Sequence, residues 1–533
     1  MPGALINSLR LARAGFVLAQ HGVHLVPKGV EIPPLVKAIL IATAPIRWLS
    51  TPFRTGIPEE KRISSAIAAL GPSYIKLGQF LATRGDLIGL ELARDLSHLQ
   101  DRLAPFSMVQ ARRAIETSLG KRLEDHYESF CPPVAAASIA QVHKAEVEDP
   151  GGQTRSVAVK VLRPDVERRF KADLDSYYFA ARQIERFHPP SRRLKPVAVV
   201  DTLKRTTELE MDLRLEAAAI SEMAENIVGD QGFRVPNVDW KRTSRRVLTL
   251  DWIDGTPISD HAALDARGLD KRELGLVVIR SFLKHAMRDG FFHADMHQGN
   301  LFVDQKGLVT AVDFGIMGRL GPKERRFLAE ILHGLITRDY HRAAWVHFWA
   351  GYVPPHHPID VFAQALRAIG EPIHGRTASE ISMADLLGQL FAYTEVFDMQ
   401  TRPELIMLQK SMVIVEGVAR SLNPELNMWT AAEPVARDWM QQNLGVGGRL
   451  KEAGEGATTI ARILTDVPEL LAQAQTTLTT LSAMSREGMR LDPQTVANIG
   501  KAENRGAIWA RLPLWIGAAS LAVIAAHQLG LLP

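Results

Sequence analysis

Residues 291–315, FFHADMHQGNLFVDQKGLVTAVDFG, constrain the fold of this chain more than any other segment. Short apolar runs typical of buried strands alternate here with two polar loops. Asp295 and Asn300 lie in the first loop, and Asp313 lies in the second, thirteen residues after Asn300. Phosphoryl transfer needs a carboxylate that orients the nucleophile and oxygen ligands that hold Mg²⁺ on the phosphates. Asp295 suits the first task and Asn300 with Asp313 the second, so we predict a nucleotide site at these loops.

The order and spacing of these residues match two motifs of protein kinases. His293, Asp295 and Asn300 occupy the histidine, aspartate and asparagine positions of the H-R-D-x-x-x-x-N loop, and Asp313 begins a D-F-G motif. Either motif alone occurs by chance, but the two together, with strand-like runs on both sides, are specific. We therefore predict that Asp295 is catalytic and that Asn300 and Asp313 bind Mg²⁺ or Mn²⁺ together with ATP or ADP.

Lys160 is a further candidate, upstream of these loops. It lies in SVAVKVL, residues 156–162, which matches the V-A-I-K strand of kinases. A lysine between valines on an apolar strand is costly to bury unless an anion meets it. Phosphate oxygens and a helix carboxylate are the expected anions, and Glu216 is the best candidate for that carboxylate, which would make it catalytic too. A lysine that reaches water from an edge strand is the alternative.

Three further motifs separate the sequence from ordinary protein kinases. Lys76 and Gln79 belong to a K-x-G-Q motif, and Glu210 and Asp212 belong to an E-x-D motif. An alanine-rich loop takes the place of the glycine-rich one, and its residues are Ala135, Ala136, Ala137, Ser138, Ile139, Ala140, Gln141 and Val142. Alanine narrows the allowed φ/ψ range, so this loop should hold a nucleotide in a more restricted pose.

With these motifs the chain resembles the UbiB family of atypical protein-kinase-like ATPases, which are associated with ubiquinone biosynthesis. The resemblance covers roughly residues 55–440. It implies a bilobal α+β protein-kinase-like fold with a helical N-terminal extension over the active site and a C-terminal transmembrane helix. It also implies that the alanine-rich loop, Lys160, Leu250 and Trp252 contact the nucleotide.

The resemblance assigns a regulatory role to the K-x-G-Q and E-x-D residues. Lys76 would meet Glu210 and Asp212, and Gln79 would share the helix face of Lys76. At 100° per residue, Glu210 and Glu216 would point about 120° apart on one continuous helix. One helix could then serve Lys76 with Glu210 and Lys160 with Glu216.

Three positions depart from the family's pattern. Met296 and Gln298 stand where the family usually has prolines, so we expect a somewhat looser catalytic loop, because proline fixes φ. Ala140 stands where a glycine is common, and a glycine with positive φ is not replaced cheaply by alanine.

Changes in residue pattern divide the chain into six segments. They are a basic and apolar helical segment over 1–54, a K-x-G-Q helical extension over 55–130, a small lobe over 131–255, a large lobe over 256–444, a helical connector over 445–511 and a transmembrane helix over 512–532. Within them we predict helices over 58–88, 107–130 and 164–228, and a strand-like run over 235–240.

The C-terminal run over 512–532 contains no Asp, Glu, Lys or Arg. At ~1.5 Å per residue, its 21 residues would cross the ~30 Å of a bilayer core. Basic residues precede the run and no charge follows it, so the positive-inside rule leaves the kinase-like domain in the cytoplasm. We expect a single-pass protein of an inner membrane, bacterial rather than mitochondrial, because no long presequence precedes the domain. A buried C-terminal helix is the alternative.

The charge balance excludes one class of partner. The chain has 63 Lys+Arg and 59 Asp+Glu, which are interleaved, and a net charge of +4, so we expect no nucleic acid as a partner. The single cysteine, Cys131, excludes an internal disulfide and a multi-cysteine metal site.

Three functions from different classes are compatible with these features. The preferred one is a membrane-associated ATPase that supports ubiquinone biosynthesis by giving biosynthetic enzymes access to prenylphenol- or quinone-type lipid intermediates. The alternatives are a genuine kinase for a protein or small molecule and a nucleotide-gated scaffold for the biosynthetic complex. The complete set of nucleotide-site residues disfavours the scaffold, and the K-x-G-Q motif with the alanine-rich loop disfavours peptide phosphorylation.

Overall fold

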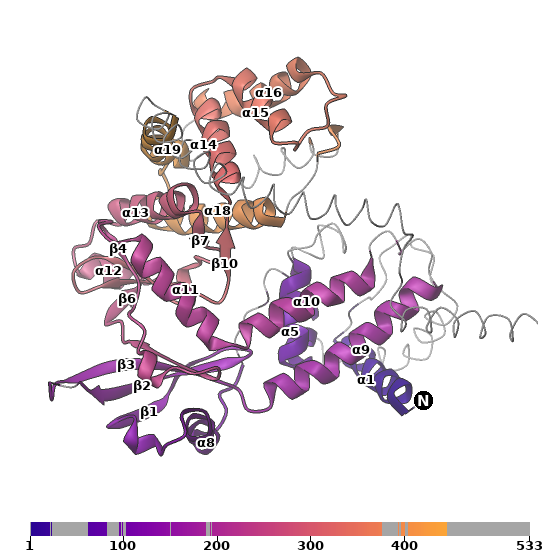
Figure 1. The fold of residues 1–533 in the computed structure, drawn as a ribbon, viewed down its shortest axis with the longest axis vertical. Coiled ribbons are helices and arrows are strands. Elements are labelled where there is room, and N and C mark those ends of the chain that lie inside the picture. Colours follow the sequence, from indigo (N-terminus) through magenta and orange to yellow (C-terminus); the bar gives the residue numbers. More distant parts are fainter. Residues whose placement is uncertain are drawn as a thin grey trace, which may run out of the picture. The chain divides into compact units, whose positions relative to one another are not determined.

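The computed structural model describes residues 2–21, 23, 62–82, 95–96, 99, 103–149, 151–187, 192, 195–375, 393, 396–399 and 403–444 (Figure 1). The chain forms two compact units, Met1–Met440 and Gln441–Pro533, and nearly all described residues belong to the first. The connector expected over 445–511 and the span expected over 512–532 lie outside the described residues. Within the described ranges, no helix has both the length and the apolar character that a membrane span needs.

A helical extension precedes the strands of the first unit. Its helices are α1 (Pro2–Gln20), α4 (Arg62–Leu70) and α5 (Pro72–Ala82). Gly71 has a φ of 106° and separates α4 from α5, so the helix predicted over 58–88 is interrupted there. Apolar side chains of α5 pack in one cluster with α9 (Val166–Phe187) and α10 (Pro196–Glu210), so the extension lies against these two helices (Figure 1).

Helix α8 (Met108–Leu119) is shorter than the helix predicted over 107–130. A capping box between Ser107 and Gln110 starts it, and Gly120, with a φ of 77°, ends it. The chain then makes the short turn η3 (Leu123–Asp125) and enters β1 (Ser129–Ala136). The left-handed glycine therefore overrides the helical spacing of the apolar residues that follow.

The small lobe contains an antiparallel sheet in the order β1-β2-β3-β5. Its other strands are β2 (Ala140–Glu148), β3 (Thr154–Leu162) and β5 (Val247–Asp251). Because side chains alternate along a strand, Val157, Val159 and Val161 share one face and pack in a cluster with residues of α8 and η3. Lys160 therefore points to the opposite face, where its partner lies on α11 (Leu213–Asn226).

The helical stretch predicted over 164–228 contains α9, α10 and α11, but Glu210 and Glu216 do not share one helix. Helix α10 ends at Glu210, and Asp212 is the N-cap of α11 with an extended backbone, φ −114° and ψ 92°. Its side chain accepts a hydrogen bond from the backbone N–H of Arg214. The 120° relation between the two glutamates was therefore wrong, because an N-cap aspartate starts a new helix between them.

The large lobe combines two small sheets with helices. One sheet has the order β4-β9-β8-β6, and the other pairs β10 with β7. The strands are β4 (Phe233–Arg234), β6 (Gly255–Pro257), β7 (Phe291–His293), β8 (Leu301–Asp304), β9 (Val309–Ala311) and β10 (Met317–Arg319). The helices are α12 (His261–Ala266), α13 (Lys271–Lys284), α14 (Pro322–Ile336), α15 (Tyr340–Trp349), α16 (Ile359–Gly375), α18 (Pro403–Leu422) and α19 (Met428–Leu444), with short turns η5 (Trp240–Arg242), η6 (His285–Asp289) and η7 (Gln298–Asn300).

The run predicted as strand-like over 235–240 does not form a ladder. It makes one isolated bridge, from Val238 to Leu250, and then enters η5. Pro236 has no N–H group to donate to a neighbouring strand, which explains why the pairing does not extend.

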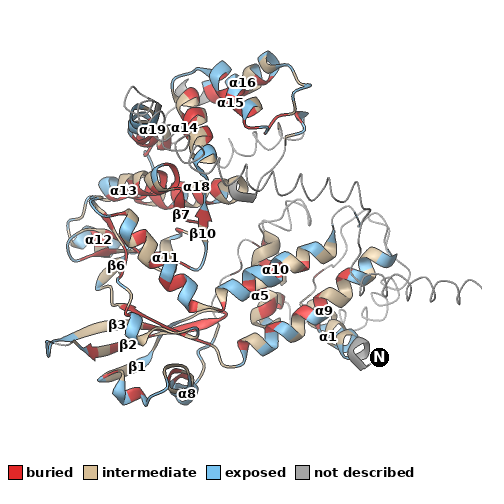
Figure 2. Ribbon diagram, in the orientation of Figure 1, coloured by how far each residue is buried: buried red, intermediate tan, exposed pale blue. Residues whose placement is uncertain are grey.

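One hydrophobic core joins the two lobes. Leu162 of the small sheet and Ile220 of α11 belong to the same buried cluster as Phe282 of α13. Buried positions line the inner sides of α11 and α13 (Figure 2). Ala294 and Phe314, which lie in the two polar loops, also belong to this cluster. The core therefore fixes both loops with respect to the small sheet.

Two buried histidines give the fold a predictable acid sensitivity. Burial lowers the pKa of His285 to about 3 and that of His347 to about 4. Both rings stay neutral in the folded protein at pH 5.5, whereas histidines in the unfolded chain bind protons below about pH 6.5. Since the unfolded state then binds more protons, the free energy of unfolding falls as the pH decreases from 6.5. We expect the pair to account for a loss of about 3 kcal/mol between pH 7.5 and 5.5.

Urea unfolding of wild type and His347→Gln at these two pH values measures this effect. The variant should lose less stability on acidification than wild type, by about half of the expected difference. His341→Gln is the matched control, because His341 is 64% exposed. An unchanged pH dependence in His347→Gln would exclude His347 as a source of the acid sensitivity.

Candidate active site

Strand β3 and helix α11 bring Lys160 and Glu216 together. Lys160 Nζ lies 2.8 Å from Glu216 Oε1 and 3.0 Å from Oε2. The two side chains are 15% and 7% exposed. Glu216 lies in the first turn of α11, where the helix dipole also favours a negative charge. The predicted contact between the strand lysine and a helix carboxylate is therefore present.

Asp313 is the second acceptor for Lys160. Lys160 Nζ lies 2.8 Å from Asp313 Oδ1. Asp313 has a φ of 62°, a left-handed conformation that aspartate tolerates better than most non-glycine residues. Phe314 beside it is buried, and its ring centroid lies 4.9 Å from that of His293. The packing of Phe314 fixes the backbone that turns the Asp313 carboxylate toward Lys160.

One ammonium group thus serves two carboxylates. Burial alone would lower the pKa of Lys160, but the charges of Asp313 and Glu216 raise it well above its usual value. The charge of Lys160 holds the pKa of Asp313 well below its usual range. Burial raises the pKa of Glu216, and Lys160 offsets this only in part. With both carboxylates ionised, the cluster has one excess negative charge, which a divalent cation would neutralise.

His293 joins the two polar loops. Its Nδ1 accepts a hydrogen bond from the backbone N–H of Asp295 at 3.1 Å, and its Nε2 lies 3.2 Å from the carbonyl oxygen of Val312. Because Nδ1 accepts, the proton is assigned to Nε2, which donates to Val312. Burial lowers the pKa of His293, which favours the neutral ring that this double role requires. The sequence motif includes His293, but the spacing of the motif does not indicate that the ring connects the two loops.

The catalytic loop presents Asp295 and Asn300 differently. Asn300 is buried, and its Nδ2 donates to the carbonyl oxygen of Asp295 at 3.1 Å, which leaves Oδ1 for a metal ion. The Asp295 side chain is 34% exposed, and His297 Nε2 lies 3.8 Å from its carboxylate. Asp295 can therefore reach a hydroxyl group or a water molecule. The hydrogen bond of Asn300 to the backbone fixes the orientation of its side chain.

Tertiary contacts hold the two positions where the family usually has prolines. Met296 is fully buried in the main core. Gln298 Nε2 donates to Ser421 Oγ on α18 at 2.7 Å. Ser411, also on α18, donates to the carbonyl oxygen of Ala294 at 3.0 Å. These contacts oppose the looseness expected from the missing prolines.

Asn300 and Asp313 together fit a hard divalent cation. An amide oxygen and a carboxylate are ligands that Mg²⁺ prefers, and the remaining positions suit phosphate oxygens and water. The Asp313 side chain is 50% exposed, so it is accessible to such ligands. The backbone N–H of Val312 donates to the carbonyl oxygen of Asn300 at 2.9 Å, which keeps the two ligand-bearing segments adjacent. The bound ion would neutralise phosphate charge during transfer.

The alanine-rich loop comprises the end of β1, a tight connection over 137–139 and the start of β2. The backbone N–H of Ala137 donates to the carbonyl oxygen of Ala140 at 2.8 Å. The Arg163 guanidinium donates to the carbonyl oxygen of Ala137 at 2.8 and 3.0 Å. Ala135 is exposed and Ala136 and Ala137 are half-buried, so this part of the loop is the accessible one. Sequence spacing gave no signal for the anchoring role of Arg163.

The C-terminal half of the alanine-rich loop is less accessible. Ser138, Ile139 and Ala140 are buried. Gln141 pairs with Val161 in the sheet register, so its side chain lies on the face opposite Lys160. There its Oε1 accepts a hydrogen bond from the backbone N–H of Phe106 at 2.9 Å. Val142 pairs with Lys160, so of these two residues Val142 shares the lysine's face.

Strand β5 and the residue after it, where the lobes are linked, offer fewer free backbone groups to an adenine ring than expected. Leu250 is buried and pairs with Ala158. The backbone N–H of Trp252 donates to the carbonyl oxygen of Ser156 at 3.1 Å. The backbone N–H of Asp251 donates to the carbonyl oxygen of Asn237 at 3.0 Å. These two N–H groups are therefore already engaged, and an adenine ring here would need other backbone groups.

Helix α5 brings Lys76 to the end of α10. Lys76 Nζ forms an ion pair with Glu210 Oε2 at 2.7 Å, and the two side chains are 13% and 10% exposed. The charge of Lys160 is the largest cause of the lowered pKa of Asp313, and the charge of Lys76 lowers it further. Lys76 therefore lies close enough to Asp313 for their charges to interact. Asp212 is bound by the Arg214 guanidinium at 2.7 and 2.9 Å. Gln79 is half-buried on α5.

The glycine of the K-x-G-Q motif has a steric reason. Gly78 is buried, and a Cβ atom at this position would collide with the Leu99 side chain and come within 3.3 Å of Ile67. A larger residue would therefore require the Leu99 and Ile67 side chains to shift. The motif thus combines a packing residue, Gly78, with a charged one, Lys76.

A second connection between α11 and the segment after Asp313 was not apparent in the sequence. Arg319 on β10 forms two hydrogen bonds with Glu222 on α11, at 2.8 and 2.5 Å. Its guanidinium also lies 4.4 Å from the ring centroid of Phe291. Helix α11 is therefore connected to Asp313 through Lys160 at Glu216, and directly to β10 six residues later.

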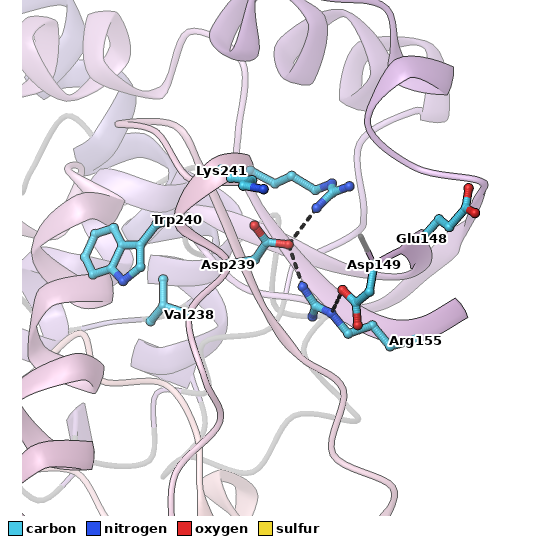
Figure 3. Close-up of a pocket in the computed structure, with 8 residues that line it drawn as sticks. Glu148, Asp149, Arg155, Val238, Asp239, Trp240 and Lys241 are labelled. Atoms are coloured by element: carbon cyan, nitrogen blue, oxygen red, sulfur yellow. Dashed lines mark hydrogen bonds and ion pairs between the residues drawn. The ribbon is translucent and has the colours of Figure 1, made fainter. Parts of the chain in front are cut away.

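A pocket of about 480 Å³ lies away from these residues (Figure 3). Arg155 in it donates to Asp149 at 2.8 Å and to Asp239 at 2.7 Å, and Arg242 donates to Asp239 at 2.8 Å. Four of its charged groups, Arg155, Asp149, Asp239 and Arg242, thus bind one another, and none of the candidate nucleotide-site residues lines the pocket.

Comparison with known proteins gives matches over most of the chain. A family model described as "ABC1 atypical kinase-like domain" matches residues 98–347, and one described as "UbiB helical domain" matches residues 366–427. A "Probable protein kinase UbiB" from Aeromonas hydrophila subsp. hydrophila is 39% identical over 468 residues, 87% of this chain and 84% of the relative. One from Marinobacter nauticus is 36% identical over 470 residues, with the same two coverages, 87% and 84%. The solved "complex structure of Rv3197-erythromycin from Mycobacterium tuberculosis" is 23% identical, with coverages of 75% and 97% and a TM-score of 0.45.

Replacement of Asp313 by asparagine tests the metal-binding role. The shape of the side chain stays the same, so we expect a folded protein that has lost its second anionic partner for Lys160. Mg²⁺-dependent ATP affinity should fall more than about 10-fold, because a hydrogen bond or ion pair of a charged group contributes about 1.5–3 kcal/mol. The measurement is the shift of the thermal midpoint on titration with ATP, with and without Mg²⁺.

Asp295→Asn is the matched control for this variant. It changes a carboxylate of the neighbouring loop that we predict to orient the nucleophile and not to bind the metal ion, so the midpoint shift with ATP and Mg²⁺ should persist. An equal shift in wild type and Asp313→Asn would remove Asp313 from the metal site.

Proposed function

The chain belongs to the ABC1/UbiB family of atypical kinase-like proteins, and on this basis we propose that it is a membrane-associated ATPase that supports ubiquinone biosynthesis. The observation that carries the proposal is the binding of Lys160 to both Glu216 and Asp313. With Asn300 and Asp295 on the adjoining loop, this arrangement has the groups needed to bind a metal-bound nucleotide and to orient a water molecule. The substrate class is a prenylphenol- or quinone-type lipid, which ATP turnover makes accessible to soluble enzymes.

The helical extension supports an ATPase over a peptide kinase. A peptide acceptor must approach Asp295, and the ion pair of Lys76 with Glu210 holds α5 within electrostatic reach of the same site. A water molecule needs far less room than a peptide. Transfer to a protein or small-molecule hydroxyl is the second candidate, because the Asp295 carboxylate is 34% exposed and the relatives are named protein kinases.

Membrane attachment through residues 512–532 is part of the proposal. It is based on the length of this uncharged run and on the basic residues before it. The relatives compared above come from bacteria, which suits an inner membrane with the kinase-like domain on the cytoplasmic side. Attachment would keep the nucleotide site close to lipid substrates.

Complementation of a bacterial strain that lacks its own family member tests the proposed function. Lipid extracts of the deleted strain should contain an early prenylphenol and no ubiquinone. The wild-type chain should restore ubiquinone, and Asp313→Asn at equal expression should not, because metal-bound nucleotide is required. A chain lacking residues 507–533 should restore it only partly and should leave the membrane fraction.

The outcomes of the complementation separate the three functions. Full rescue by both Asp313→Asn and Asp295→Asn would mean that turnover is dispensable and would favour a scaffold. Normal ubiquinone in the deleted strain would exclude the pathway. Rescue that needs Asp295, without ATP hydrolysis by the purified protein, would favour a kinase with a separate acceptor.

Replacement of Lys76 by alanine tests whether α5 restricts access to the site. Glu210 would lose its partner near the metal-bound phosphates, and repulsion between like charges should lift the helix. We expect a changed nucleotide affinity and increased transfer of phosphate to the protein itself. The measurement is incorporation of labelled phosphate, with Lys76→Ala/Asp295→Asn as the background.

Lys204→Ala is the matched control for this experiment. Lys204 lies on α10 and pairs with Glu208 at 3.9 Å in an exposed position. It should therefore behave like wild type. If Lys76→Ala also matches wild type in affinity and incorporation, α5 does not restrict the site.

A further inference from the structure

Two histidines and an aspartate meet on the large lobe, outside the active site. His356 and His357 lie in the segment between α15 and α16, and Asp398 lies between α16 and α18. One ligand atom of each residue lies within 4.8 Å of the other two. The function proposed above gives these three side chains no task.

The distances in this cluster suit a tetrahedral metal ion. His356 Nε2 lies 3.7 Å from Asp398 Oδ2, and His357 Nε2 lies 3.3 Å from the same atom. Ligand atoms bound to tetrahedral zinc at 2.0–2.2 Å are about 3.4 Å apart. Small movements, mainly of the exposed His356 and Asp398 side chains, would therefore place all three ligand atoms around one ion.

The backbone holds both sides of the cluster. Pro354, Pro355 and Pro358 flank the histidines and fix their own φ values. The two imidazole rings have centroids 4.1 Å apart, so they lie side by side rather than on opposite sides of the chain. Both Nε2 atoms can then face the same carboxylate.

The aspartate is fixed by its neighbour. Asp398 has a φ of 48°, in the left-handed region. Phe397 beside it is buried, with its ring centroid 5.4 Å from that of His357 and 4.9 Å from that of Phe362 on α16. The segment that carries the carboxylate is therefore packed against His357 and against α16.

We propose that His356, His357 and Asp398 form a zinc-binding site. Two imidazole nitrogens and one carboxylate are typical zinc ligands, whereas Asn300 and Asp313 in the active site offer the oxygen ligands that magnesium prefers. Two protonated rings so close together would repel each other, but two neutral rings can both donate lone pairs to one cation. Three protein ligands leave the fourth position to water or to a ligand atom of a partner.

The bound ion would connect two segments that are distant in sequence. His357 and Asp398 are 41 residues apart, and α16 lies between them. Zinc would therefore link the two ends of the segment that contains α16. Its binding to the folded state would stabilise that state, more so as the site fills.

The test is zinc binding to the full-length chain after removal of any affinity tag and dialysis against chelator. Titration calorimetry with zinc chloride and metal analysis should give one high-affinity ion per chain. His356→Ala and Asp398→Asn should weaken binding at least about 10-fold. Zinc at about 100 times its dissociation constant should raise the thermal midpoint of wild type by about 2–4 °C, and that of the variants by much less.

His341→Ala is the matched control, because His341 forms a similar pair with Asp360, at 3.0 Å, without a second histidine. It should bind zinc like wild type, and so should Asp313→Asn, since its change lies in the magnesium site. His356 is 64% exposed, so its replacement should leave the fold intact. Equal zinc affinity in wild type and His356→Ala, or no binding by wild type below about 1 mM, would overturn the proposal.

Discussion

The ammonium group of Lys160 binds two carboxylates that come from different elements, Glu216 on α11 and Asp313 on the loop after β9. A buried lysine needs such partners, because an unpaired charge in the interior is costly. The same contact makes the position of a helix depend on the conformation of a loop. If α11 moved away, Lys160 would keep only the carboxylate that a metal ion also needs. Charge balance at one side chain thus couples the small lobe to the loop that carries Asp313.

Packing makes this coupling rigid. The small sheet, α11, α13 and α18 share one core, and both polar loops place a residue in it, Ala294 and Phe314. Polar contacts then add to the core packing in holding the two loops and α11 in place. His293 connects the two loops through their backbones, and Arg319 binds α11 a second time through Glu222. The site is therefore preorganised mostly by residues that would not touch a nucleotide.

The break between α10 and α11 separates two glutamates, Glu210 and Glu216, that bind different lysines. Glu210 ends one helix and binds Lys76 of the extension, whereas Glu216 begins the next helix and binds Lys160. Asp212 stands between them as an N-cap and is bound by Arg214. Because the helix restarts there, the extension and the small sheet each have a carboxylate on a separate helix. A displacement of α5 therefore reaches the nucleotide site through charge and through α10, not along one rigid helix.

The sequence by itself determined which residues are candidates for the site and which face of the sheet carries Lys160. Motif spacing predicted Lys160, Asp295, Asn300 and Asp313 as site residues, and the alternation of SVAVKVL set the lysine apart from the valines, because both depend on residues close together in the chain. Sequence patterns could not show the anchoring of the alanine-rich loop by Arg163, the Gln298–Ser421 hydrogen bond that opposes the loss of a proline, or the meeting of His356 with Asp398. Helix ends were also misjudged wherever a glycine or an N-cap interrupted an apolar pattern, as at Gly71, Gly120 and Asp212. Each of these contacts between distant residues depends on which elements the shared core brings together, and that choice is made by the packing of the whole chain.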